Sequence, residues 1–463
     1  MVNQHSTSNL TPLQHLQDSF AIVDFSGSMR MVNRGQIKNI LGGKTKGDVS
    51  YYAKPDANIK MHRHLESLPL ACTPRKVIED FWNSPSTHLY DQIAFDPRPT
   101  PNTTLNFWAG HLPDAKPGNW VAIRDYMLKV ICSNDQHLFD YLISYLAHMV
   151  QHPEDKPGVM LALLGGQGTG KGVFFTLLRA IWPMTTLQVS KIDQVVGRFT
   201  SALERNYIIC MDEALFAGDR QAIDNLKSIV TEQYLHIEQK FQPSRTIESV
   251  HRLFAASNHE HFAHIESDDR RFVFLRVSNV HQQDTRYFSS IARSIADDDT
   301  IKALIYYLQR KNLATFNVRN KPHTNEQFLQ KIKSLQGFER FWYEVLSRRT
   351  FNVMDDSAKP WSTTIFIATT DLLQKYLAYN KGAEKYHPLQ ESQVLATINR
   401  VCPKAKTGIR GHTHTHRGKV QLRGVRLPSL DAARQDFCDY IGHEVEWEDT
   451  KNYDSQDTDQ TPP

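Results

Sequence analysis

The chain has 463 residues, of which 40% are hydrophobic and 22% are charged, as is usual for a globular protein of two to four domains. The formal net charge of +4 at pH 7 is too small to indicate a polyanionic partner, so any case for nucleic acid depends on local clusters of basic residues. The polar N-terminus lacks the apolar run of a signal peptide, and no stretch approaches the roughly 20 apolar residues that a membrane span needs. We therefore expect no membrane partner.

The cysteines indicate the redox setting. Their spacing contains no Cys-x-x-Cys pair, which favours reduced thiols over a disulfide scaffold or a zinc site. We therefore expect a cytoplasmic protein. The five cysteines are Cys72, Cys132, Cys210, Cys402 and Cys438.

The first 157 residues divide into two expected regions. Residues 1–100 form a small α+β region, in which FAIVDFSGSMRMV (20–32) predicts two short strands around a Ser-Gly turn. Asp24 in this segment has no acidic partner at strand spacing, and a region of this length is short for a primase, so we expect no primase activity. Residues 101–157 form a helical collar, because apolar residues recur at helical spacing over 121–150.

A glycine-rich loop follows, in LLGGQGTGKGVFF (161–173). An apolar strand leads into it and a helix follows, which is the context of a phosphate-binding loop: backbone N–H groups converge on phosphate oxygens, and Lys171 reaches the outer phosphates. Gly172 stands where this pattern usually has Ser or Thr, so we expect magnesium to be held by Asp212 and water instead. The expected nucleotide-binding residues are Gly165, Gly166, Gln167, Gly168, Thr169, Gly170, Lys171, Gly172 and Val173.

Two further strands end in polar side chains. The apolar run in NYIICMDEALFAGD (206–219) ends at Asp212 and Glu213, and on a strand beside the loop this pair would lie next to the phosphates. We expect Asp212 to hold Mg²⁺, directly or through water, and Glu213 to polarise the attacking water. In HRLFAASNHEHF (251–262) the apolar run ends at Asn258, whose amide can reach both the γ-phosphate and that water.

Paired arginines enter a fourth strand, in ESDDRRFVFLRV (266–277). Arg270 could act as a finger on the ATP of a neighbouring subunit and stabilise transition-state charge; Arg271 is an open alternative. The alternation of strands and helices over 158–285 predicts an α/β ATPase core. We expect a helical extension over 286–354, with a linker at 355–362.

The segment 363–447 reads as two helices followed by a basic hairpin, the order of a winged-helix DNA-binding domain. His412, His414 and His416 alternate within the hairpin; with no acidic residue or cysteine nearby, we interpret them as exposed histidines rather than metal ligands. The acidic tail 448–463 is expected to be disordered. The basic residues expected to contact DNA in the hairpin are Arg410, Arg417, Lys419 and Arg423.

The succession of loop, acidic pair and strand-tip asparagine resembles the superfamily 3 helicases, most closely the helicase module of phage and plasmid primase-helicases. The resemblance covers about residues 100–447. It implies an AAA+-like P-loop core that uses ATP and Mg²⁺, with Lys171, Asp212, Glu213, Asn258 and Arg270 as catalytic residues. It also implies a lysine on a channel hairpin, for which Lys240 in LHIEQKFQPSRTI (235–247) is the match.

The same resemblance implies a biological setting. The protein would be a replicative helicase of a phage, plasmid or integrated element in a bacterial cytoplasm, translocating as a homo-hexameric ring on single-stranded and forked DNA, with a separate primase or polymerase as a further partner. Two alternatives stay open. One is a replication initiator that binds ATP as a structural switch; the other is a nucleotide kinase, since small kinases of the adenylate kinase type share the Gly-Lys-Gly loop.

Overall fold

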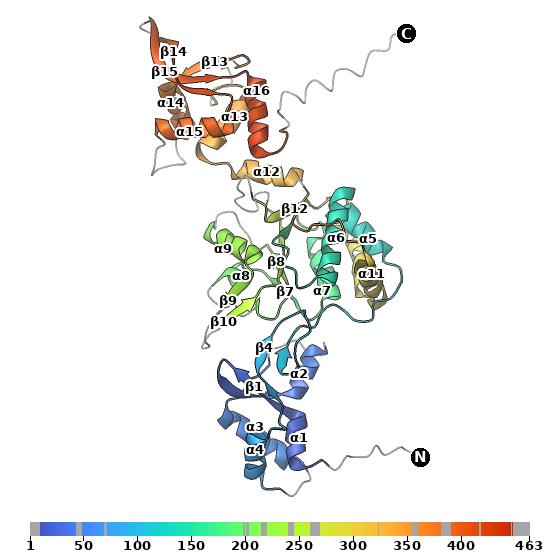
Figure 1. Ribbon diagram of the computed structural model, residues 1–463. Helices are drawn as coiled ribbons and strands as arrows, with labels where there is room; N and C mark the ends of the chain where they lie inside the picture. Colours follow the sequence, from blue (N-terminus) through green and yellow to red (C-terminus); the bar gives the residue numbers. More distant parts are fainter. Residues whose placement is uncertain are drawn as a thin grey trace, which may run out of the picture. The chain divides into compact units, whose positions relative to one another are not determined.

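The computed structural model describes two compact units, one made of residues 1–262 and 270–324 and the other of residues 263–269 and 325–463 (Figure 1). Among the described residues, no helix is both long and apolar enough to cross a bilayer. The described residues are 10–42, 49–68, 72–197, 200, 203–213, 220–238, 245–259, 269–322, 324–353, 360–380, 390–415, 418–445 and 447.

The first unit begins with a three-stranded sheet of order β2-β1-β3, covered by helices. The two strands expected around the Ser-Gly turn are β1 and β2, joined by Ser26 and Gly27, both at positive φ. Leu16, Met61 and Phe81 are fully buried and join the helices to the sheet. The elements are α1 (Pro12–Ser19), β1 (Phe20–Phe25), β2 (Ser28–Asn33), α2 (Arg34–Leu41), α3 (Lys54–Glu66), α4 (Pro74–Asn83) and β3 (Leu89–Tyr90).

A connecting region leads to the core of the unit. Strands β4 (Gln92–Ala94) and β5 (Thr104–Asn106) pair in parallel, so the boundary expected at residue 100 falls between two strands that hydrogen-bond to each other. Helix α5 (Val121–Tyr126) then runs into a π-helical turn, η1 (Met127–Ile131), and α6 (Gln136–Gln151) follows. The side chain of Asp135 caps α6 by accepting from two backbone N–H groups of its first turn.

The core is a five-stranded parallel sheet of order β12-β6-β11-β8-β7. Strands β6, β8, β11 and β12 are almost wholly apolar because they are buried inside the unit, as is typical of parallel sheets with both faces covered. Helices α6 and α11 lie side by side (Figure 1). The strands are β6 (Met160–Leu164), β7 (Thr186–Val189), β8 (Ile208–Asp212), β11 (Arg252–Ser257) and β12 (Phe272–Arg276).

The remaining elements of this unit are helices and one hairpin. Asp284 and Asp297 cap α10 and α11 through side-chain hydrogen bonds. Strands β9 and β10 form an antiparallel pair. The elements are α7 (Lys171–Ile181), α8 (Asp193–Val196), α9 (Arg220–Thr231), β9 (Tyr234–Ile237), β10 (Arg245–Glu248), α10 (Thr285–Ala296) and α11 (Asp298–Arg310).

The second unit combines helices with a three-stranded antiparallel sheet of order β13-β15-β14. The order of two helices and a hairpin expected within 363–447 is present as α14, α15, β14 and β15; β13 and α16 were not expected. The elements are α12 (Asn325–Ser334), α13 (Gly337–Arg348), β13 (Ile365–Ala368), α14 (Thr369–Tyr379), α15 (Glu391–Val401), β14 (Lys406–Thr415), β15 (Gly418–Leu427) and α16 (Leu430–Ile441).

The expected helical extension over 286–354 is divided between the units. Helices α10 and α11 belong to the first unit, whereas α12 and α13 belong to the second. The reason is aromatic packing: the rings of Phe338 and Phe341 on α13 lie 5.4 and 5.8 Å from that of Tyr376 on α14. Most of the expected linker at 355–362, and the whole tail 448–463, lie outside the described residues.

Candidate nucleotide site

The glycine-rich loop 165–170 joins the end of β6 to the start of α7. Gly170 has φ 99°, a left-handed conformation that favours glycine, and a Cβ there would lie 2.4 Å from a ring carbon of Phe288. Neighbouring elements hold the loop: the backbone N–H of Gln283 donates to Gly168 O over 2.9 Å, and the Tyr126 hydroxyl donates to Gly170 O over 2.9 Å. The shape of the loop therefore depends on α5 and α10 as well as on its own glycines.

Lys171 begins α7 and is only 7% exposed. Its ammonium donates to Gly165 O over 2.7 Å, to Gly166 O over 2.8 Å and to Asn258 Oδ1 over 2.6 Å. Burial lowers the pKa of Lys171, against the attraction of the Glu213 and Asp212 carboxylates. The lysine is thus a buried cation held at the mouth of the loop by three oxygen acceptors.

The acidic pair and Asn258 meet Lys171 at the carboxyl edge of the sheet. Asp212, the last residue of β8, pairs with Ala256 of β11, and Asn258 follows the end of β11. The Asn258 amide, which accepts from Lys171 through Oδ1, donates through Nδ2 to Glu213 Oε1. One amide therefore links the lysine to the carboxylate, so Lys171, Asn258 and Glu213 form a continuous hydrogen-bonded chain.

Glu213 has a left-handed backbone conformation. Its φ is 53°, which is uncommon for a residue with a side chain, and its N–H donates to Ala256 O over 3.0 Å. The turn begins directly after β8, and the Glu213 side chain is exposed. Strained backbone of this kind is concentrated at functional sites.

A residue that the sequence analysis missed completes the site. Gln188 on β7 donates through Nε2 to Asp212 Oδ2 over 2.9 Å and accepts from Arg179 on α7 over 2.6 Å. The sequence shows a glutamine in the short segment that forms β7, but only the strand order makes β7 the neighbour of β8.

The side chains around the loop could bind Mg²⁺ only together with the phosphates of a nucleotide. Within the described part of the chain, no three His, Cys, Asp or Glu side chains come together as a metal site. Where Mg²⁺ binds together with a phosphorylated substrate, its ligands are commonly one or two carboxylates, waters and the substrate phosphates. Asp212, at the mouth of the loop, fits the role of the protein ligand.

Residues 163–271, which carry the loop, the acidic pair and Asn258, match a protein family described as a family of unknown function, DUF5906. Among curated proteins, the DNA primase-polymerase of Nitratiruptor phage NrS-1 is 29% identical over 154 residues, which are 31% of this chain and 21% of that protein. The match thus spans about a fifth of the length of that relative.

The fold resembles that of the NrS-1 C-terminal region. Two apo structures of that region have TM-scores of 0.60 and 0.61, with 15% and 14% sequence identity. They cover 90% and 91% of this chain, and 99% and 100% of the solved chains. At these identities the likeness concerns the fold alone.

Arg270 lies near the amino ends of the sheet strands, whereas the loop lies at their carboxyl ends. It precedes β12, whose first residue, Phe272, pairs with Met160, the first residue of β6. The loop follows the other end of β6, after Leu164. Arg270 is exposed, whereas Arg271 is half-buried. The structure therefore brings Lys171, Asp212, Glu213 and Asn258 together and leaves Arg270 apart from them.

The expected DNA-contacting residues are described only in part. Lys240 and Arg417 lie outside the described residues, although β9 and β10 flank Lys240 as expected of a hairpin. In the second unit, Arg410 of β14 is directly opposite Arg423 of β15, and both are exposed. The backbone of Lys419 pairs with that of His414.

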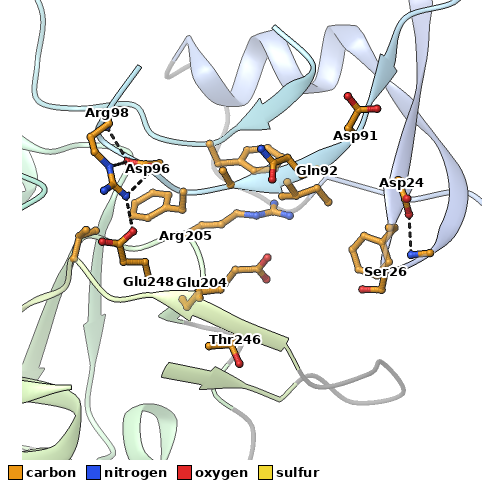
Figure 2. A pocket seen from close by; sticks show the side chains of 18 residues that line it. Asp24, Ser26, Asp91, Gln92, Asp96, Arg98, Glu204, Arg205, Thr246 and Glu248 are labelled. Atoms are coloured by element: carbon orange, nitrogen blue, oxygen red, sulfur yellow. Dashed lines mark hydrogen bonds and ion pairs between the residues drawn. The ribbon is translucent and has the colours of Figure 1, made fainter. Parts of the chain in front are cut away.

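A separate cavity of about 420 Å³ lies around Asp24 in the first unit (Figure 2). Asp91, Asp96, Glu204 and Glu248 line it together with Asp24, so acidic residues from several elements face one cavity. Several of these carboxylates have structural partners. Asp24 accepts from the backbone N–H of Gly27, and Asp96 and Glu248 both pair with Arg98.

Proposed function

We propose that this chain is an ATP-dependent replicative DNA helicase of the superfamily 3 type, from a phage, plasmid or integrated element. In this proposal the parallel sheet is an AAA+-like P-loop ATPase core, α5 and α6 belong to a helical collar, and the second unit contains a winged helix. The observation that carries the proposal is the hydrogen-bonded chain from Lys171 through Asn258 to Glu213 at the carboxyl edge of the sheet.

The geometry suggests a role for each side chain. Phosphate oxygens over the loop would accept from the buried Lys171 ammonium, which lies within reach of the loop carbonyls. The exposed Glu213 carboxylate would accept a proton from the attacking water, and Asn258 would hold Glu213 in place relative to Lys171. Mg²⁺, held through Asp212, would neutralise charge on the phosphates.

The relative supports a role in DNA replication. That relative, a DNA primase-polymerase, is 29% identical to this chain over 154 residues, and the match with DUF5906 includes the loop and the acidic pair. A function in phage or mobile-element replication, in the cytoplasm of a bacterial host, follows as a proposal. A separate primase or polymerase would then act beside it.

The position of Arg270 favours a ring. The strand β12 has five residues, so Arg270 is separated from the loop of its own chain by a strand length of roughly 16 Å. An arginine finger at that place could serve only the nucleotide of a neighbouring subunit. We therefore propose a homo-hexamer in which each Arg270 completes the adjacent site.

The hairpin of the second unit supports a DNA contact. Like charges directly opposite each other in a sheet destabilise it, yet Arg410 faces Arg423 and Lys406 faces Arg426. A phosphate backbone placed along the hairpin would relieve this repulsion. We propose that this hairpin binds duplex DNA near a fork and that Lys240 contacts a single strand in the ring.

The decisive experiment is an ATPase and forked-DNA unwinding assay on the purified protein, with Glu213→Gln as the inactive variant and Glu79→Gln, at an exposed position on α4, as the matched control. We expect hydrolysis that single-stranded DNA stimulates and unwinding that Glu213→Gln abolishes. ATP binding without turnover would support the initiator instead. Transfer of phosphate to a nucleoside monophosphate would support the kinase.

A further inference from the structure

Three side chains form a relay that ends on Asp212. An Arg179 nitrogen donates to Gln188 Oε1 over 2.6 Å, and Gln188 Nε2 donates to Asp212 Oδ2 over 2.9 Å. Because a guanidinium only donates, the amide oxygen of Gln188 must face Arg179. The amide nitrogen must then face the carboxylate. Arg179 therefore determines which end of the Gln188 amide donates to Asp212.

The strand register explains why Gln188 reaches Asp212. Gln188 pairs with Cys210 in the parallel β7–β8 ladder, and Asp212 lies two residues beyond Cys210 on β8. Residues two apart on a strand point to the same face. Gln188 and Asp212 therefore share a face of the sheet, and α7, which carries Arg179, follows the loop directly.

Gly172 has no hydroxyl that could bind Mg²⁺. The phosphate-binding loop normally supplies a hydroxyl to Mg²⁺ at this position. A Cβ added to Gly172 would meet no atom within 4 Å, so the space for a hydroxyl side chain exists although the residue does not use it. The carboxylate of Asp212 then has to be oriented without help from the loop.

We propose that Gln188 and Arg179 are positioning residues for the Mg²⁺–nucleotide complex. Gln188 occupies one oxygen of Asp212 and fixes the plane of the carboxylate, which leaves the other oxygen directed for the metal or its water. Mg²⁺ demands near-ideal octahedral geometry, and residues that orient a metal ligand commonly contribute about 10–100-fold to metal affinity. The relay thus compensates for the missing hydroxyl at residue 172; this inference rests on the proposed function.

The test measures how strongly Mg²⁺ tightens ATP binding, as the ratio of the Kd in EDTA to the Kd in Mg²⁺, by titration of a fluorescent ATP analogue. Gln188→Met keeps the length of the side chain and removes both hydrogen bonds. We expect it to lower this ratio by about 10-fold or more and to leave the Kd in EDTA unchanged. Arg179→Met, which breaks the relay from its other end, should lower the ratio in the same direction.

Rescue separates positioning from a general structural effect. Adding Gly172→Ser to Gln188→Met should restore much of the lost ratio, because a hydroxyl would return to the loop in open space. Gln435→Met is the matched control: Gln435 donates to Asp439 over 3.0 Å in the second unit, and its loss should leave the ratio unchanged. An unchanged ratio in Gln188→Met, or no rescue by Gly172→Ser, would overturn the inference.

The outcomes also distinguish the inference from the function on which it rests. If the wild-type protein binds no ATP with or without Mg²⁺, the proposed function fails and the inference fails with it. If the wild-type protein binds ATP more tightly in Mg²⁺ and Gln188→Met does so equally, only the inference fails.

Discussion

The Lys171 ammonium donates to Asn258 Oδ1 over 2.6 Å, across a sequence separation of 87 residues. Two parallel strands produce this contact, since Ser257 of β11 pairs with Leu164 of β6. Asn258 directly follows β11, and Lys171 follows the loop at the end of β6. The amide of Asn258 also donates to Glu213, so one side chain connects the lysine that we expect to bind phosphate with the expected catalytic carboxylate.

The first prediction concerns the roles of Lys171 and Glu213 in ATP hydrolysis. Lys171→Ala should abolish ATP hydrolysis, because the outer phosphates lose their buried cation. Glu213→Gln should bind ATP with nearly wild-type affinity but hydrolyse it at least about 100-fold more slowly, because the amide accepts no proton from the water. Steady-state hydrolysis and equilibrium ATP binding together measure both effects. Wild-type turnover by Glu213→Gln would remove Glu213 from the mechanism.

The second prediction compares two glycines of the loop region. Gly170→Ala should weaken ATP binding strongly, because a Cβ at φ 99° would lie 2.4 Å from Phe288. Gly172→Ala should be tolerated, since its Cβ would meet no atom within 4 Å. Equilibrium ATP binding of the two variants is the measurement. Equal affinities would show that nucleotide binding does not depend on this loop conformation.

The third prediction concerns assembly. Arg270→Ala should bind ATP normally and hydrolyse it poorly, because Arg270 lies at the far edge of the sheet and would act on a neighbouring subunit. Mixtures of Arg270→Ala and Glu213→Gln should recover part of the activity, since each variant supplies what the other lacks. Arg293→Gln, an exposed arginine on α10, is the control. No recovery at any mixing ratio, together with a monomeric mass in ATP, would contradict the ring.

The fourth prediction concerns the hairpin. Arg410→Gln and Arg423→Gln should each weaken duplex binding and lower the slope of log K against log salt by about 0.9 per lost phosphate contact. Duplex affinity measured at several salt concentrations tests this, with Arg75→Gln on α4 as a control of equal charge change. Superimposable salt curves for all three variants and the wild type would mean that the hairpin does not bind DNA.

The fifth prediction concerns stability and pH. His251 is buried, and burial lowers the pKa of its imidazole to about 4 from the usual 6.5. Nε2 lies 2.7 Å from Leu203 O, an acceptor, so it carries the proton, and Nδ1 accepts from the Ser249 hydroxyl. Between pH 6.5 and 4 the unfolded chain binds more protons than the folded chain, so stability falls as the pH falls.

The expected loss is roughly 3 kcal/mol over this pH range if the transition is two-state. Denaturant unfolding at several pH values measures it. His251→Gln should be less stable at neutral pH and should lose this part of the pH dependence, whereas His137→Gln, at an exposed position on α6, should keep it. An identical pH dependence in His251→Gln would show that another group is responsible.

Local pattern was enough to predict the elements that carry the candidate site. The apolar runs ending at Leu164, Asp212 and Ser257 are buried strands, and the glycine-rich segment is the loop before a helix. Such short, continuous apolar runs bounded by glycines and polar residues are a local property of the chain. The grouping of Lys171, Asp212, Glu213 and Asn258 followed once the strands were taken as parallel neighbours.

Tertiary structure decided what depends on strand order and on packing between distant segments. The contact of Gln188 with Asp212 exists because β7 is the neighbour of β8, and the placement of α13 in the second unit follows from the packing of its aromatic rings with Tyr376. Local pattern decides neither contact, because strand order and ring packing join residues that are far apart in the sequence. The sequence by itself thus determined which residues stand at strand ends, and only the three-dimensional packing decided which side chain donates a hydrogen bond to Asp212.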